Sequence, residues 1–175
     1  MTSNRFNEGF SLIELLLVVA IIGIISAVAI PNLISSKRSA NEASALAALR
    51  VISSGEATYQ STAGGGLYGD LAALRDHKLV DQSVGAATIA GPGTPKNGFL
   101  FSAENIDGAG GPAFDAKAQP SVHVSAGTLF ATGSRSFFVN EAGAVYFNTT
   151  GTAPTCSATD TRTVTPGDGG GVLNN

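Results

Sequence analysis

Apolar residues are concentrated in one run close to the N-terminus. Between Phe10 and Ile30 almost every position is apolar, whereas the chain beyond is rich in glycine, alanine, serine and threonine. Wound as an α-helix at about 1.5 Å per residue, this run spans roughly the 30 Å hydrocarbon core of a bilayer. The pattern predicts a membrane-spanning helix over residues 10–30. We expect a kink at Pro31, because its ring removes a backbone donor.

The helical pattern continues beyond the apolar run. Leu49, Ile52 and Tyr59 lie on one side of this second half, and Glu56 interrupts the apolar stripe that they form. Such a stripe is typical of a helix that is buried on one side against a sheet. We therefore expect one long helix over residues 10–60.

A globular, strand-rich part is expected over residues 61–175. Three consecutive glycines at 64–66 end the helical pattern. Leu71 and Leu74 then indicate a short amphipathic helix. Five later runs have the composition of strands. These runs are 99–102, 122–125, 128–132, 136–140 and 144–148.

The last two expected strands form the clearest hairpin. Asn140, Glu141, Ala142 and Gly143 supply turn residues between two apolar runs. Consecutive hairpins imply an antiparallel sheet, with the long helix covering one face. We therefore expect an α+β fold, in which a long N-terminal helix packs on a small antiparallel β-sheet. The Gly- and Thr-rich tail after Gly151 should be irregular.

Charge and cysteine content narrow the class of protein. The net charge is -3, and the basic residues beyond the apolar run are scattered among acidic ones. This distribution argues against a nucleic-acid-binding surface on a single subunit. Cys156 is the one cysteine, so the chain forms no intrachain disulfide and the strand-rich part depends on packing or on its neighbours.

Glu14 stands inside the apolar run and separates three interpretations of the N-terminus. A secretory signal peptide would be cut after Ala29, because Ala27-Val28-Ala29 has the small residues of a cleavage site. A permanent single-pass anchor also fits the length. Neither explains an acidic side chain whose insertion into a membrane costs about 2.5 to 3.5 kcal/mol.

The third interpretation explains the acid. A cut between Gly9 and Phe10 would discard a hydrophilic leader, residues 1–9, and leave a free amine on Phe10 that is largely cationic at neutral pH. In a bundle of such helices staggered by about one turn, this amine would meet Glu14 of the next subunit. The pair would neutralise two buried charges and set the register of assembly.

Two stretches of the chain resemble the processing motif of type IV prepilins and pseudopilins. They are Gly9-Phe10-Ser11-Leu12-Ile13-Glu14-Leu15 and, after the apolar run, Ala29-Ile30-Pro31-Asn32. The resemblance implies that a membrane-embedded peptidase cuts after Gly9 and methylates Phe10, and that Glu14 serves assembly. It also implies a cytoplasmic N-terminus. The family usually has a basic residue where this chain has Glu8.

From the resemblance we expect a structural subunit, a pilin, of a type IV pilus-like extracellular filament for adhesion, motility or surface contact. Its partners would be further copies of the chain, the prepilin peptidase and methyltransferase, and a pilus or secretion assembly platform. The precursor would lie in the inner membrane and the assembled subunit at the cell surface. The alternative is a pseudopilin of a type II secretion or DNA-uptake system. A membrane-anchored binding or enzymatic head is a third interpretation.

The remaining residues give little indication of catalysis. His77 and His123 lack ligand spacing, and Cys156 has no paired base in view, so we expect no enzyme and no required cofactor. Acidic residues in the expected loops could bind calcium, although they lack the regular spacing of a calcium loop. These acids are Asp107, Asp115, Asp160 and Asp168.

Overall fold

The structure of the protein is a computed structural model. It describes residues 9–108, 111–124, 128, 130–156, 163–165 and 170–173. The chain divides into two compact units, Met1–Ser36 and Lys37–Asn175, and each is described by itself. The long helix α1 (Leu12–Ser61) contributes residues to both.

Pro31 lies inside α1, in the part that belongs to the first unit. Because proline has no amide hydrogen, the carbonyl of Ala27 lacks its usual helical donor. One residue further on, the side-chain amide of Asn32 donates to the carbonyl of Val28 at 3.1 Å. The helix therefore continues through the proline, and the kink expected there stays a prediction.

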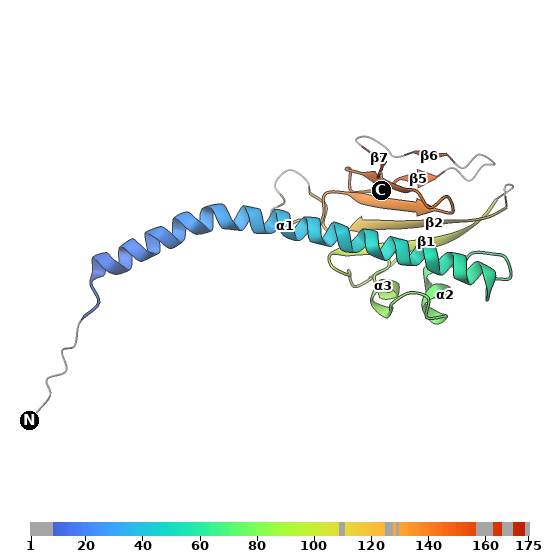
Figure 1. The fold of residues 1–175 in the computed structure, drawn as a ribbon, viewed down its shortest axis with the longest axis horizontal. Helices are drawn as coiled ribbons and strands as arrows, with labels where there is room; N and C mark the ends of the chain where they lie inside the picture. The colour runs from blue at the N-terminus through green and yellow to red at the C-terminus, as the bar shows by residue number, and fades with distance from the viewer. Residues whose placement is uncertain are drawn as a thin grey trace, which may run out of the picture. The chain divides into compact units, whose positions relative to one another are not determined.

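The second unit is built on a five-stranded antiparallel sheet with the order β1-β2-β3-β4-β7 (Figure 1). A separate two-stranded ladder pairs β5 with β6. The long helix followed by this sheet confirms the expected α+β fold. The strands are β1 (Phe99–Gly108), β2 (Gly111–Pro120), β3 (Ser136–Asn140), β4 (Val145–Asn148), β5 (Thr155–Cys156), β6 (Val164–Thr165) and β7 (Gly171–Val172).

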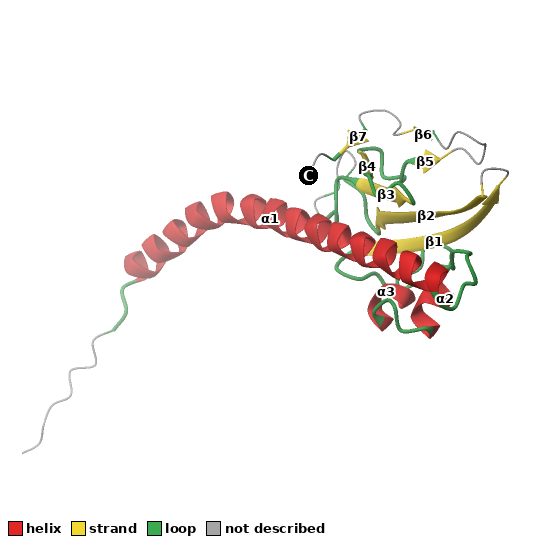
Figure 2. Ribbon diagram, turned by 45° about the vertical axis from the view of Figure 1, so that its right-hand side comes forward, coloured by secondary structure: helices red, strands yellow, loops and turns green. Residues whose placement is uncertain are grey.

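Two short helices connect α1 to the sheet and lie beside β1 (Figure 2). They are α2 (Leu71–Asp76) and α3 (Gln82–Ala86). The side chain of Asp70 caps α2 by accepting a hydrogen bond from the amide of Ala73 at 2.7 Å. Helix α2 confirms the short amphipathic helix expected after the glycines, and its two leucines are buried.

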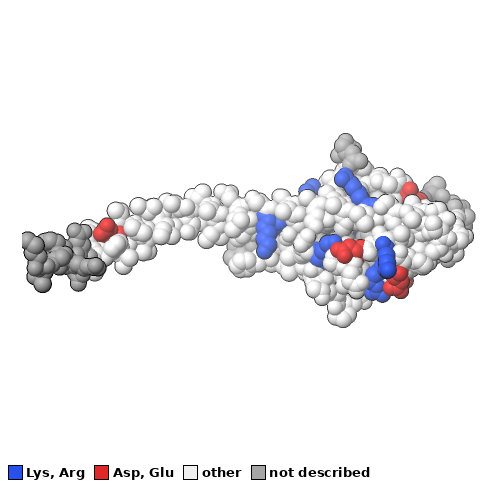
Figure 3. Space-filling view, turned by 60° about the horizontal axis from the view of Figure 1, so that its bottom comes forward, with Lys and Arg blue, Asp and Glu red and all other residues white. Residues whose placement is uncertain are grey.

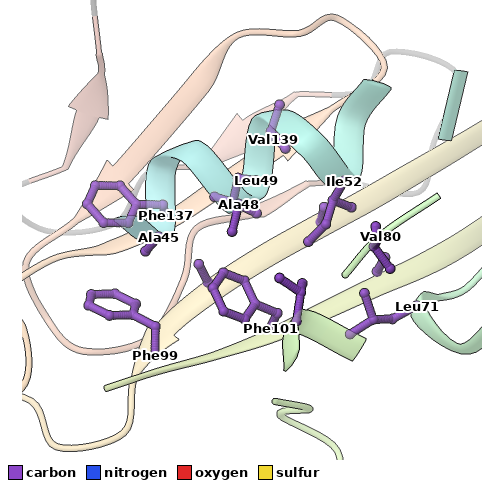
Figure 4. Close-up of a cluster of buried hydrophobic side chains, with 14 of the residues drawn as sticks. Ala45, Ala48, Leu49, Ile52, Leu71, Val80, Phe99, Phe101, Phe137 and Val139 are labelled. Atoms are coloured by element: carbon purple, nitrogen blue, oxygen red, sulfur yellow. The ribbon is translucent and has the colours of Figure 1, made fainter. Parts of the chain in front are cut away.

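The part of α1 that belongs to the second unit packs on one face of the sheet. Leu49 and Ile52 have no exposed surface, as the apolar stripe predicts. They lie in one cluster with Phe99 and Phe101 of β1 and Phe137 of β3 (Figure 4). Burying a side chain of this size contributes about 1.5 to 3 kcal/mol to stability. This cluster therefore holds the helix on the sheet.

Strand β2 lies between β1 and β3, and the sequence pattern does not predict it. Among its residues, GPAFDAKAQP, Phe114 alone is a strong strand former. Ala116 and Ala118 have no exposed surface and belong to the cluster below α1, where small side chains let the helix approach. Ladder hydrogen bonds on both sides, rather than local propensity, therefore maintain β2.

Two of the expected strands, 122–125 and 128–132, are wrong. Where the structure describes these residues, they form no strand. Instead, the amide and hydroxyl of Thr132 both donate to the carbonyl of Val122, at 2.8 and 3.1 Å. The two segments therefore bond to each other in a loop, and this loop replaces the predicted pairing with the sheet.

The hairpin expected near residue 140 is confirmed as β3 and β4. Gly143 has a φ of 74°, a conformation that glycine adopts readily, and its amide donates to the carbonyl of Asn140 at 2.9 Å. Side chains alternate along β3, so Phe138 faces away from α1. There its ring packs against Tyr146 with the centroids 6.2 Å apart.

Glu42 connects α1 to the loop before β3. Its Oε1 accepts hydrogen bonds from the amide and hydroxyl of Ser134 at 2.8 and 2.7 Å, and its Oε2 accepts from Arg135 Nε at 2.8 Å. Burial acts to raise the pKa of Glu42, but the bonds from Ser134 and Arg135 outweigh it and lower the pKa from 4.5. The guanidinium of Arg135 also lies over the Phe137 ring, 5.7 Å from its centroid.

Candidate processing and assembly site

The segment before α1 contains the predicted cleavage junction. Gly9, Phe10 and Ser11 are not helical. The carbonyl of Ser11 accepts the amides of Glu14 and Leu15 at 3.1 and 3.2 Å, so Ser11 is the N-cap residue of the helix. The bond between Gly9 and Phe10 therefore lies outside the helical hydrogen-bond pattern, where a peptidase can bind the backbone in an extended form.

Gly9 and Phe10 are both exposed, and 73% of the Phe10 surface is accessible. A Cβ atom placed on Gly9 would have no described heavy atom within 4 Å. The fold of the chain therefore does not require glycine at this position. A requirement for glycine there would come from an enzyme that approaches the backbone closely.

Ser11 and Glu14 have the spacing of a capping box, a pattern that our sequence analysis overlooked. An acid in the first turn interacts favourably with the partial positive charge at the N-terminus of a helix. This provides a local role for Glu14 in the uncut chain. The Glu14 side chain is exposed, so its carboxylate is also accessible to a group from another molecule.

Cleavage at the predicted junction would change the charge at this end of the helix. A new α-amine on Phe10 would add a positive charge beside the partial positive charge of the helix N-terminus. Glu14 is the only acidic residue between Gly9 and Ser36. Glu14 is therefore the one carboxylate in this stretch of the sequence that could neutralise the charge of a Phe10 amine.

The first part of α1 is not covered by other parts of the first unit. From Leu12 to Leu33 its large apolar side chains are exposed, from 44% at Val18 to 80% at Leu12. No residue from Leu15 to Ser36 is charged, and Figure 3 shows this stretch without charge on the face in view. By length and composition the helix is able to cross a membrane. Exposed apolar surface on this scale is typical of a site that contacts a membrane or another protein.

The two histidines and the cysteine lie in the second unit. The His77 ring packs edge-on against Tyr59, with the centroids 5.3 Å apart. His123 Nε2 lies 3.0 Å from the carbonyl oxygen of Ser134. Cys156 is a partly exposed residue of β5. These contacts belong to the packing of the unit and assemble no catalytic arrangement among the residues described.

The candidate calcium ligands are spread over different elements. Asp107 lies on β1 and Asp115 on β2, whereas Asp160 and Asp168 lie outside the described residues. Within the described ranges, no group of three or more His, Cys, Asp or Glu side chains is placed to hold a metal ion. Calcium binding therefore stays a prediction.

Residues 4–30 match the family described as the prokaryotic N-terminal methylation motif. A stretch of 38 residues is 55% identical to the type IV wide pilus major component PilA4 of Thermus thermophilus, and covers 22% of this chain and 29% of that protein. No solved structure matches the chain.

The junction at Gly9 and Phe10, Glu14 and most of the exposed apolar run all fall within the matched residues. The chain therefore carries the N-terminal methylation motif of type IV prepilins and pseudopilins, joined to a type IV pilin-like arrangement of one long helix and an antiparallel sheet.

Proposed function

We propose that the chain is the precursor of a structural subunit, a pilin, of a type IV pilus-like extracellular filament. The observation that carries the proposal is the exposed apolar part of α1 with one acid near its start. In a permanent anchor that acid would have only the local role of a cap at the start of the helix. A subunit that leaves the membrane for a bundle of identical helices would use it once the leader is removed.

The proposed mechanism has two environments for the same helix. A prepilin peptidase cuts between Gly9 and Phe10 and methylates the new amine, which stays basic after methylation. The mature subunit then waits in the inner membrane with its apolar helix in lipid. An assembly platform moves it into the filament, where neighbouring helices replace the lipid and Glu14 pairs with the amine of the next Phe10.

Packing in such a bundle explains why the apolar side chains cover every side of the helix. A helix that packs against one partner needs a single apolar stripe, whereas one surrounded by copies of itself is apolar all round. In lipid the hydrophobic effect does not draw helices together. The charge pair would therefore supply the register, and close packing the cohesion.

The first prediction concerns the mature N-terminus. Mass spectrometry of the protein from the bacterium that makes it should find Phe10 as the first residue, with one methyl group on its amine. A mature chain that begins at Ile30 would instead support a secretory signal peptide, and a chain that still begins at Met1 would support a plain anchor. Recovery of the mature chain in filaments sheared from the cell surface distinguishes a pilus from a pseudopilus confined to the envelope.

The second prediction concerns the glycine at the junction. Gly9→Leu should leave most of the protein as uncut precursor in the membrane, because a bulky side chain would obstruct the peptidase, whereas a Cβ atom at this position meets no described atom within 4 Å. Gly23→Leu is the matched control, since Gly23 also has no described atom within 4 Å of a new Cβ. An immunoblot should show the shorter mature band for Gly23→Leu alone. Equal cleavage of both variants would contradict the assigned junction.

A further inference from the structure

Glu56 is a fully buried acid in the core of the second unit. It lies on α1 one turn after Ile52 and has no exposed surface. The amide of Gly69 donates to its Oε2 at 2.9 Å. Its Oε1 is buried and has no hydrogen-bond partner among the described residues. An ionised carboxylate offers about four acceptor sites, so one donor leaves most of its charge without compensation.

The hydrogen bond from Gly69 joins α1 to residues 62–70, which we call the return segment. This segment reverses the chain after α1 and packs closely against Tyr59. The amide of Gly64 donates to the Tyr59 carbonyl at 2.7 Å. A Cβ atom on Gly69 would lie 3.2 Å from the Tyr59 ring. The return segment therefore contacts the buried carboxyl group directly through Gly69.

The charges around Glu56 do not favour its ionised form. The strands below α1 present apolar side chains to the helix, and α3 presents Val84. The titratable groups nearby in the chain are Tyr59 on α1, Tyr68 and Asp70 in the return segment, and Arg75 and His77 at the end of α2. Of these, the carboxylate of Asp70 acts on Glu56 and disfavours its negative charge.

We propose that Glu56 is a pH-sensitive latch: the return segment closes over its carboxyl group while that group is neutral, and ionisation of the buried group loosens the segment. The proposal does not depend on filament assembly. Outside the cytoplasm, where the proposed function places this unit, the surrounding pH is not held constant by the cell. The latch would then change the surface at this end of the unit with the acidity of the surroundings.

The direction of the effect follows from proton linkage. Burial raises the pKa of Glu56 from 4.5 to about 7, the Gly69 hydrogen bond opposes this rise, and the charge of Asp70 adds to it. Between these two values the closed state binds more protons than the open state. Its stabilisation by Glu56 is therefore fully present below pH 4.5 and is lost as the pH rises through about 7.

Hydrogen exchange of backbone amides tests the latch in the full chain, purified in a mild detergent. After correction for intrinsic exchange, protection of residues 62–70 should fall by about 30-fold between about pH 5.5 and about pH 8.5. In Glu56→Gln, which keeps an acceptor for Gly69, protection should be the same at both pH values. Glu141→Gln, at an exposed turn, should behave as the wild type does.

Asp70→Asn provides a second, independent measurement. Asparagine caps a helix as well as aspartate does, so α2 should remain intact. Without the negative charge, the midpoint of the protection loss should move to lower pH. Protection of the return segment that is independent of pH in the wild type would overturn the proposal. It would equally be overturned by the same loss in Glu56→Gln, or by an unmoved midpoint in Asp70→Asn.

Discussion

Cells that carry Glu14→Ala are expected to produce mature protein but almost no filaments. The substitution leaves the junction at Gly9 and the apolar helix unchanged, so cleavage and membrane insertion should proceed. In the proposed bundle it leaves the amine of a neighbouring Phe10 without a carboxylate. An unpaired charge in such surroundings costs about 3 to 5 kcal/mol, which lowers the equilibrium for adding a subunit by at least about 100-fold.

The measurement compares sheared surface filaments with the membrane pool, by immunoblot and N-terminal mass spectrometry. Glu14→Asp keeps the charge on a shorter side chain and should restore part of the yield. Ser26→Ala removes a hydroxyl from the apolar run away from the junction and should assemble as the wild type does. A wild-type yield of filaments from Glu14→Ala would refute the proposed pairing.

Glu42→Ala is expected to lower the free energy of unfolding of the second unit by about 3 kcal/mol. It removes one partner of a largely buried ion pair and leaves the amide and hydroxyl of Ser134 without their acceptor. The value lies at the lower end of the range for such pairs, because the side chain of Arg135 is 37% exposed. Denaturation of the detergent-solubilised full chain can be followed by tyrosine circular dichroism, since all three tyrosines lie in this unit.

Glu104→Ala is the matched control, because Glu104 forms an ion pair with Lys117 at 3.5 Å but is 58% exposed. That change should cost no more than about 1 kcal/mol. The lowered pKa of Glu42 also sets the pH dependence. Its contribution is present above pH 4.5 and is lost as the pH falls through the lower folded value, so the difference between wild type and Glu42→Ala should shrink in acid. Equal losses from both alanine variants would contradict the assigned role of Glu42.

Elements with a strong local pattern were predicted well. The apolar run and the stripe of Leu49 and Ile52 indicated the long helix and the face that it buries. The turn ending at Gly143 indicated the hairpin of β3 and β4. In each case the residues that decide the structure lie close together in the chain. Their spacing or turn chemistry is therefore visible before any tertiary contact forms.

Strand β2 and the loop before β3 could not be predicted from the local sequence pattern. Residues 111–120 are poor in strand formers, and they become a strand because β1 and β3 offer ladder hydrogen bonds on both sides. The expected strands 122–125 and 128–132 contain strand-forming residues, but where the structure describes them they form no strand, and Thr132 bonds to Val122 in a loop. Pairing between strands is a long-range event, and local propensity is too weak to determine it.

The acidic residues of α1 also differ in how much of their role the sequence reveals. Glu14 could be singled out from the sequence, because a charge among apolar residues is conspicuous and its proposed partner is created a few residues away. In the sequence Glu56 is an interruption of an apolar stripe, and no local pattern indicates the interactions of Glu42. The structure places the donors for Glu42 some 92 residues further along the chain. It also removes Glu56 from water beside Gly69.

The sequence by itself determined the processing motif, the apolar helix and the class of fold, because each depends on residues that are neighbours in the chain. The tertiary structure alone decided the course of the sheet, the anchoring of α1 through Glu42 and the burial of Glu56. Those features depend on which distant groups meet and on how much water they exclude. Such contacts, rather than residue type, determine whether a glutamate is a surface charge, half of an ion pair or a neutral buried acid.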